Sequence, residues 1–266
     1  MQLKNLVAAL AMATALVSCN QDDNNQVSTT EKGNLNVEFD NVFNGADLIL
    51  NTQVNTTSLN ENLKVGLVKY IVSNIVLTKA DGTTFTYPTA DGYFIVNESD
   101  AASRVLQLQD IPAGDYTSIQ FGIGVDQEHF NLGAGGQGDF LAHAQNEDML
   151  WSWSAGYKFV AFEGTFTSAT VASDTSFMVH TGQTGTAYNY KVITLAMPDN
   201  ALVRSTITPQ IHIMADVSKL IDGTNKISLT NNNMGGMGTM IMGGTNLELI
   251  TSNLTNMFSV HHVHND

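Results

Sequence analysis

The chain has 266 residues, a formal net charge of -14 at pH 7 and a single cysteine. An acidic chain of this kind lacks the basic surface that nucleic acids require, so we expect no nucleic-acid partner. The lone cysteine excludes an intramolecular disulfide, and the length suits one large domain after a short N-terminal region.

The N-terminus has the composition of a secretory signal. A basic start is followed by an apolar run over residues 6–17 and then by Ser18 and Cys19. The run is shorter than the ~20 apolar residues that span a bilayer. Leu16-Val-Ser-Cys19 resembles a bacterial lipobox, which implies cleavage before Cys19 and a lipid on its sulfur. We therefore expect a lipoprotein signal peptide over residues 1–18.

Residues 19–33 are polar and acidic, and they contain almost nothing that could bury apolar area. Such a composition predicts a flexible tether. Acidic residues shortly after the lipidated cysteine, at Asp22 and Asp23, resemble the surface-export signal of Bacteroidota lipoproteins. We expect an outer membrane lipoprotein, periplasmic or on the cell surface, whose remaining residues 34–266 form one domain.

That domain shows many short β patterns and few helical ones. Residues 246–258 could form a short C-terminal helix, and Asp216 could cap a helical turn over 216–221. The turn spacing predicts an all-β fold: a single β-sandwich, immunoglobulin-like or jelly-roll-like, with long loops. Strands are predicted at residues 35–39, 48–50, 63–77, 83–87, 93–96, 104–108, 116–123, 157–162, 175–180, 190–197 and 206–214.

An irregular loop is expected over residues 124–147, where four glycines fall between 133 and 138. Loops of this length in a compact domain usually carry function or are disordered. The loop holds His129 and His143. It leads into Asp148–Gly164, which contains both tryptophans of the chain.

The tryptophans lie close together, as Trp151 and Trp153, just after Met149. On an extended backbone their indoles point to the same face. Filling one end of the sandwich core would explain them without any function. A family resemblance favours a functional interpretation instead.

The chain resembles the MbnP-like copper-binding proteins from about residue 34 to its C-terminus. The motifs that carry the resemblance are Gly122-Ile-Gly-Val-Asp126, Met149-Leu-Trp-Ser-Trp-Ser-Ala-Gly-Tyr-Lys-Phe159 with Glu163-Gly164, Phe177-Met-Val-His-Thr-Gly182, Tyr70-Ile-Val-Ser-Asn-Ile-Val-Leu77 with Asp81-Gly82, and Ile111-Pro-Ala-Gly-Asp-Tyr116. Val179 and Thr181 depart from what many family members have beside the histidine.

The resemblance implies a periplasmic or surface protein that is often encoded beside methanobactin or copper-handling genes. It also implies a partner, a di-haem enzyme of the bacterial cytochrome c peroxidase type. In that family the partner oxidises a tryptophan to kynurenine, and the modified residue belongs to the copper site. Trp151 and Trp153 are both candidates; Trp153 is favoured slightly, because it lies nearer Gly156 and the strand that follows.

The candidate ligands carry imidazole and thioether groups, which are known to bind copper. Imidazole suits copper, and His180 is placed at the end of a predicted strand, although a lone histidine there is more often a core residue. Of the two loop histidines, His129 is the better candidate for a metal ligand, and His143 is the weaker one. Met149 offers a thioether that could bind Cu(I), or it fills a gap in the core.

Two C-terminal segments add further metal-binding side chains. Met234, Met237, Met240 and Met242 stand among glycines and asparagines, which favours either a weaker Cu(I) site or an ordinary loop. His261-His-Val-His264 closes the chain, and His262 and His264 would share a face of an extended tail, enough for a weak auxiliary site.

Hydrolytic motifs are missing from the sequence, as is a phosphate-binding loop. We therefore predict a protein, not itself an enzyme, that binds copper as Cu(I) for acquisition, storage or hand-over. Two alternatives remain open: a surface carbohydrate-binding or adhesion module that uses a Trp-x-Trp platform, and a purely structural lipoprotein.

Overall fold

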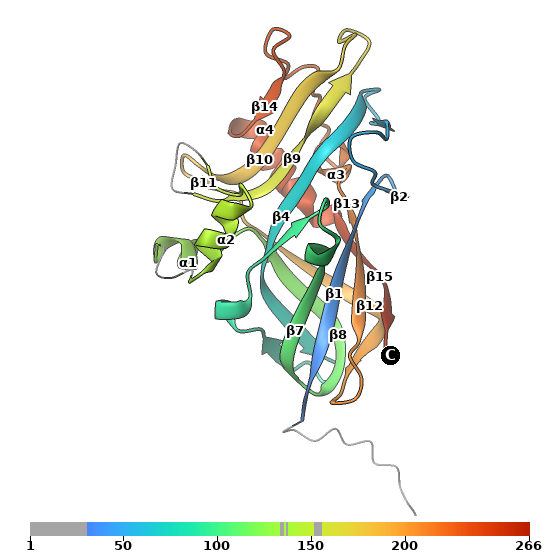
Figure 1. Cartoon of the computed structure of the whole chain (residues 1–266), viewed down its shortest axis with the longest axis vertical. Coiled ribbons are helices and arrows are strands. Elements are labelled where there is room, and N and C mark those ends of the chain that lie inside the picture. The colour runs from blue at the N-terminus through green and yellow to red at the C-terminus, as the bar shows by residue number, and fades with distance from the viewer. Residues whose placement is uncertain (1–30, 134–135, 137, 152–155) are drawn as a thin grey trace, which may run out of the picture.

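The computed structural model describes residues 31–133, 136, 138–151 and 156–266. The expected signal peptide, Cys19, most of the expected tether and Trp153 lie outside these residues. Figure 1 shows an elongated molecule built mainly of strands, with a few short helices. None of the described helices is long and apolar enough to cross a membrane.

The smaller of the two sheets that the described residues form has the order β15-β13-β1-β2, and β7 also pairs with β1. β1 runs parallel to β13 and antiparallel to β2 and β7. The strands are β1 (Lys32–Phe43), β2 (Ala46–Asp47), β7 (Val105–Pro112), β13 (Gln210–Asp216) and β15 (Phe258–His264).

The larger sheet has the order β11-β10-β9-β4-β8-β12, with β14 on β10 and three short strands on β4. The long strand β4 pairs with β9 along its first half and with β8 along its second. The strands are β3 (Asn55–Thr56), β4 (Asn62–Lys79), β5 (Thr84–Thr86), β6 (Phe94–Asn97), β8 (Gly114–Ile123), β9 (Lys158–Thr167), β10 (Thr175–Thr184), β11 (Ala187–Tyr188), β12 (Lys191–Val203) and β14 (Thr239–Ile241).

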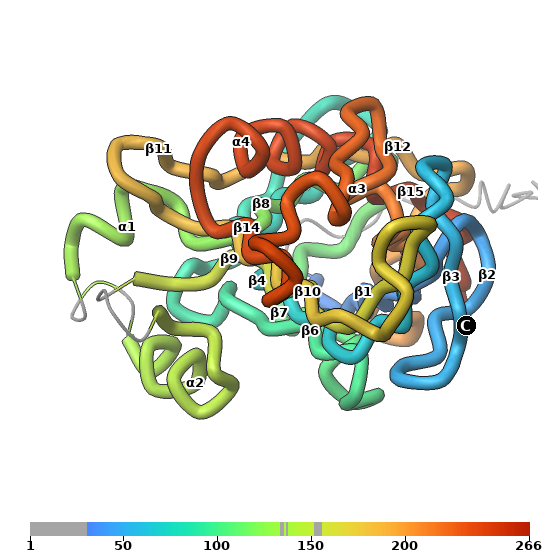
Figure 2. Tube along the Cα trace, turned by 90° about the horizontal axis from the view of Figure 1, so that it is seen from above, coloured from blue at the N-terminus to red at the C-terminus, as the bar shows by residue number. Residues whose placement is uncertain are grey.

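The helices are short and lie at the periphery. Figure 2 shows α1 and α2 on one side of the molecule, far from β2 and β3. The α-helices are α1 (Gln127–Asn131), α2 (Phe140–Asn146), α3 (Lys219–Asp222) and α4 (Gly244–Asn253), and the 3-10 helices are η1 (Thr89–Asp91), η2 (Ala101–Arg104) and η4 (Leu254–Asn256).

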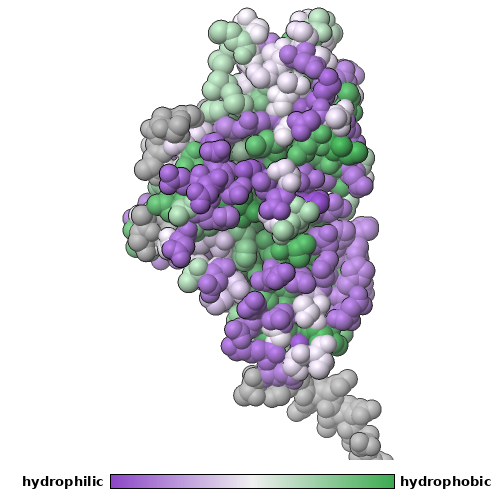
Figure 3. Space-filling model, in the orientation of Figure 1, coloured by the Kyte–Doolittle hydropathy of each residue, from purple (hydrophilic) through white to green (hydrophobic). Residues whose placement is uncertain are grey.

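Alternating side chains explain why the two sheets face each other. In β1, Leu35, Val37 and Phe39 are buried, while the residues between them are partly exposed. Both sheets contribute to one large hydrophobic cluster, so the fold is a β-sandwich with curled sheets and a shared core. The face in Figure 3 is covered largely by hydrophilic side chains, with hydrophobic patches between them.

A second, smaller cluster lies on the other face of the larger sheet. Along β9, Val160 and Phe162 belong to the main core, whereas Phe159 and Ala161 belong to this second cluster. Residues from the region of α1 and α2, including Phe140 and Ala144, cover it. We call this surface the outer face of the larger sheet, and it carries the candidate site.

The structure agrees with the predicted all-β sandwich and differs from the sequence predictions locally. Residues 63–77 form one long strand as expected, and a register shift follows Ser73 in β4. The strand predicted at residues 48–50 is wrong, since the chain forms only β2 just before it. The loop predicted over residues 124–147 contains α1 and α2.

Candidate metal site on the outer face of the larger sheet

His180 is the residue around which the candidate site is built. It lies within β10, which continues to Thr184, so the prediction that the strand ends at His180 is wrong. The strand alternates: Phe177 and Val179 enter the main core, and His180 points to the outer face. Its side chain is only 5% exposed.

Glu163 holds the ring of His180. Nε2 of His180 lies 2.7 Å from Oε1 of Glu163 on the neighbouring strand β9. The hydrogen bond from His180 holds the pKa of Glu163 below its ordinary value, although partial burial opposes this. A carboxylate that accepts from Nε2 places the ring proton there, so Nδ1 carries the lone pair.

The second ring nitrogen of His180, Nδ1, is available to bind a metal. Nδ1 of His180 is buried and has no hydrogen-bond partner among the residues that the structure describes. Buried polar atoms normally find a partner. A buried imidazole whose other nitrogen is bound to a carboxylate has the arrangement of a metal-ligating histidine. The residues present therefore fit a metal ion.

Trp151 packs against this imidazole. The ring centroids of Trp151 and His180 are 5.6 Å apart, and the indole is almost completely buried. Trp151 follows Leu150, which forms an antiparallel bridge with Tyr157, and the backbone N–H of Trp151 donates to the carbonyl of Gly156. Gly182 makes room for it, because a Cβ there would lie 3.0 Å from Nε1 of Trp151.

The methionine-rich segment reaches the same sheet through β14. This strand runs parallel to β10, with Met240 beside Met178 and Ile241 beside Val179. Met178 stands two positions before His180 and therefore lies on the same outer face, and Met240, which pairs with Met178, shares that face. Both retain some exposure, whereas Met237, in the turn before β14, is 81% exposed.

The other predicted ligands have different surroundings. Nδ1 of His129 lies 2.8 Å from both carboxylate oxygens of Asp126, and its ring packs edge-on against Tyr93. Met149 is fully buried in the second cluster, where it fills space among aromatic rings. The described contacts thus join Trp151 to His180, but they do not bring His129 or Met149 to that pair.

Glu163 is the residue of the candidate site that sequence reasoning did not single out. The signal was present, because Glu163-Gly164 is one of the motifs that carry the family resemblance. Gly164 also has a structural role, since a Cβ there would lie 2.2 Å from the carbonyl oxygen of Lys64. The role of Glu163 depends on the pairing of β9 with β10, which the sequence alone does not give.

Comparison with known proteins places the chain in a family. No curated protein matches the sequence. Among solved structures, MbnP from Methylosinus trichosporium is similar, with 15% sequence identity and a TM-score of 0.48, over 81% of this chain and 82% of that chain. The model of the MbnP family matches residues 32–242, so the chain belongs to the MbnP family.

Proposed function

We propose that this protein binds copper as Cu(I) on the outer face of the larger sheet and serves in copper acquisition, storage or hand-over. In this proposal it is a binding protein and not an enzyme. It is anchored to the outer membrane by a lipid on Cys19, facing the periplasm or the cell surface. Copper is its cargo.

The observation that carries the proposal is the state of His180. Its Nε2 is bound by Glu163, and its buried Nδ1 has no partner among the described residues. Imidazole is a good copper ligand, and a carboxylate on the far nitrogen fixes the tautomer and raises the basicity of the ligand. A merely structural histidine in this position would leave a buried acceptor unsatisfied, at a cost of about 1–3 kcal/mol.

The neighbouring methionines favour the Cu(I) state. Thioether sulfur is a soft donor that selects Cu(I) over harder cations. Met178 and Met240 lie on the same face as His180 and close to it in strand register. In this proposal their sulfur atoms join Nδ1 of His180 in a mixed imidazole and thioether donor set.

Trp151 is the residue that we propose to be oxidised to kynurenine. An intact indole offers only an N–H donor and is a poor ligand. Cleavage of its C2–C3 bond adds two oxygen atoms, and hydrolysis then releases the former C2 as formate. Two equivalents of hydrogen peroxide balance the oxidation and are reduced to water. A di-haem cytochrome c peroxidase-like partner would use this oxidant, and the product carries a carbonyl and an aromatic amine beside His180.

The burial of Trp151 argues against the carbohydrate-binding alternative. A platform that stacks on sugars must expose its aromatic faces, and Trp151 is only 5% exposed. Trp153 lies outside the described residues, so the argument rests on Trp151 alone.

Copper affinity of a His180→Gln variant tests the proposal. We expect Cu(I) affinity, measured by competition with a chromophoric chelator, to fall by more than about tenfold, since a ligand contributes at least as much as its outer-shell partners. His143→Gln is the matched control, because His143 is an exposed histidine on α2. Equal Cu(I) affinity of wild type and His180→Gln, with an intact fold, would remove His180 from the site.

A further inference from the structure

Outside the matched family region, the C-terminal strand β15 brings a second group of histidines together. β15 pairs antiparallel with β13, and His262 stands directly opposite His212. In β13, Ile211 and Ile213 are buried in the main core, so His212 between them points away from it. The family model ends its match at residue 242, before this strand begins.

A β-bulge places two adjacent histidines on one face. The register shifts after the pair His212 and His262, because Ile213 stands opposite Val260. His261 is therefore the extra residue, and Val260 and Val263 pack against the core on either side of it. In a regular strand His261 and His262 would point to opposite faces. A bulge re-aims a side chain in this way.

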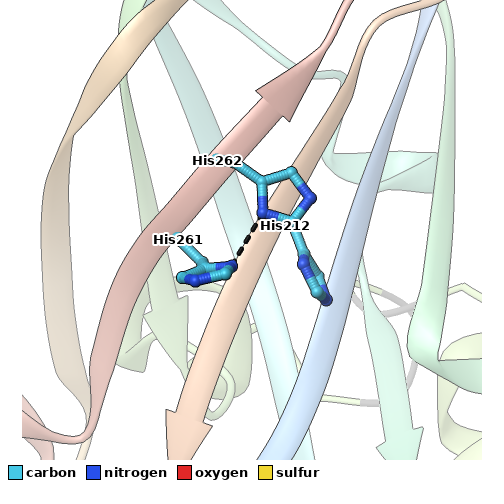
Figure 4. Close-up of side chains that lie close together, drawn as sticks. All are labelled: His212, His261 and His262. Atoms are coloured by element: carbon cyan, nitrogen blue, oxygen red, sulfur yellow. Dashed lines mark hydrogen bonds between the residues drawn. The ribbon is translucent and has the colours of Figure 1, made fainter.

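The three imidazoles converge, as Figure 4 shows. Nδ1 of His261 and Nδ1 of His262 are 2.7 Å apart. The ring centroid of His212 is 4.6 Å from that of His262 and 5.9 Å from that of His261. Each residue offers one nitrogen such that all three atoms lie within 4.8 Å of one another.

The surroundings of His212 favour a cation. Its Nδ1 is buried without a hydrogen-bond partner among the described residues. Its Nε2 lies 3.8 Å from a carboxylate oxygen of Asp40 and 3.9 Å from one of Glu38, both on β1. These distances are too long for good hydrogen bonds, but two carboxylates create a negative potential that attracts a metal ion.

We propose that His212, His261 and His262 form a second metal site that takes a divalent cation of the Zn(II) and Cu(II) class. Nitrogen ligands about 2.1 Å from a tetrahedral ion lie about 3.4 Å apart, so small side-chain rotations bring the three nitrogens to one ion. Three imidazoles leave a fourth position open for water or another ligand. The site lies on the smaller sheet, whereas His180 lies on the larger one.

His264 has a supporting role in this arrangement. Its Nε2 lies 2.8 Å from Nε2 of His262, on the opposite side of that ring from His261. If Nε2 of His264 accepts a hydrogen bond from Nε2 of His262, the proton of His262 is on Nε2. Nδ1 of His262 then keeps the lone pair that binds the metal. Metal-ligating histidines commonly donate their other N–H to such a partner.

Titration of the purified protein with Zn(II) and with Cu(II) tests the proposal. The titrations are made on wild type and on His180→Gln, so that copper bound at the larger sheet is counted separately. We expect one high-affinity equivalent to remain in His180→Gln and to be lost when His212, His261 and His262 are all changed to Gln. The bound Cu(II) should show nitrogen couplings in its electron paramagnetic resonance spectrum.

Single variants distinguish a metal site that includes His212 on β13 from metal binding by the C-terminal histidines alone. His212→Gln and His261→Gln should each weaken Zn(II) binding by more than about 100-fold, and His264→Gln by about tenfold, as for an outer-shell partner. His261 is exposed, so we expect its replacement to leave the fold intact. Binding that is unaffected by His212→Gln would show that the tail alone holds the metal. A loss in His264→Gln as large as in His212→Gln would also overturn the assignment.

Discussion

His180 and Glu163 meet diagonally across two neighbouring strands. Residue for residue, His180 stands opposite Ala161 and Glu163 stands opposite Met178, yet Nε2 of the histidine lies 2.7 Å from the carboxylate. The contact needs both side chains on the outer face of the larger sheet. The orientation of the His180 ring therefore depends on the register in which β9 and β10 pair.

Glu163→Gln tests whether this contact orients a metal ligand. The amide oxygen can still accept a hydrogen bond, but the negative charge is lost. We expect Cu(I) affinity to fall by about 10- to 100-fold, the usual effect of removing a group that is hydrogen-bonded to a metal ligand, and the melting temperature to change little. Chelator competition measures the affinity.

Glu147→Gln is the control for this change. Glu147 is also a hydrogen-bonded glutamate near the outer face, but its carboxylate is bound to Lys69 and Asn97 instead of a histidine. Its replacement should leave Cu(I) affinity as in wild type. Equal losses in both variants would mean that general surface charge, and not the orientation of His180, sets the affinity.

Local patterns in the sequence were sufficient for the fold class. The alternation in residues 35–39 and the long β-branched run in residues 63–77 predicted β1 and β4, because side chains of a half-buried strand alternate between core and solvent. The short helix α4 overlaps the first part of the C-terminal helix predicted over residues 246–258, which the structure ends at Asn253, before η4 and β15. Helices α1 and α2 were missed, since each is too short to show a helical period.

The candidate site depended on contacts that no local pattern reveals. Glu163 meets His180 through antiparallel pairing, and Met240 meets Met178 through a parallel pair between segments far apart in the chain. His212 escaped notice because an isolated histidine in a strand has no distinctive spacing. The tail was expected to align His262 with His264, and only the bulge in β15 adds His261 to the same face.

Acid should weaken the attachment of α1 through Asp126. Burial raises the pKa of this carboxyl, but hydrogen bonds from Asn74 and His129 outweigh burial and lower it to about 2. In an unfolded chain the pKa is about 3.9. The stabilisation is therefore fully present above pH ~4 and is lost as the pH falls towards 2.

Asp126→Asn measures this contribution. The amide cannot ionise, so wild type should be more stable than the variant at neutral pH by about 1 kcal/mol, a value reduced by solvent screening. The difference should shrink as the pH falls from 4 to about 2. Denaturant unfolding at several pH values measures both. A difference that is independent of pH would mean that the charge of Asp126 contributes nothing.

The contribution of each methionine to Cu(I) affinity should depend on its place in the fold. Met178→Leu and Met240→Leu keep apolar bulk but remove sulfur beside the proposed copper site, so each should lower Cu(I) affinity by about tenfold, near 1.4 kcal/mol. Met237→Leu is the control, since Met237 is exposed in the turn before β14. If Met237→Leu is as harmful as Met240→Leu, the whole loop binds copper and strand pairing is not decisive.

Oxidation of Trp151 is the final prediction. Its indole is 5.6 Å from the ring of His180, and Gly182 leaves room for it above β10. Ring opening there would deliver a carbonyl and an amine to the proposed metal, which should raise Cu(I) affinity relative to the unmodified protein. We expect co-expression with a di-haem peroxidase-type partner to yield a Trp151 peptide that has gained one oxygen and lost one carbon. Trp151→Phe should abolish this product and the gain in affinity, whereas Trp153→Phe should retain both. Kynurenine found at residue 153 alone would show that Trp153, and not Trp151, is the oxidised residue. Unmodified tryptophans, together with unchanged copper binding in both variants, would refute the oxidation and favour the glycan-binding alternative.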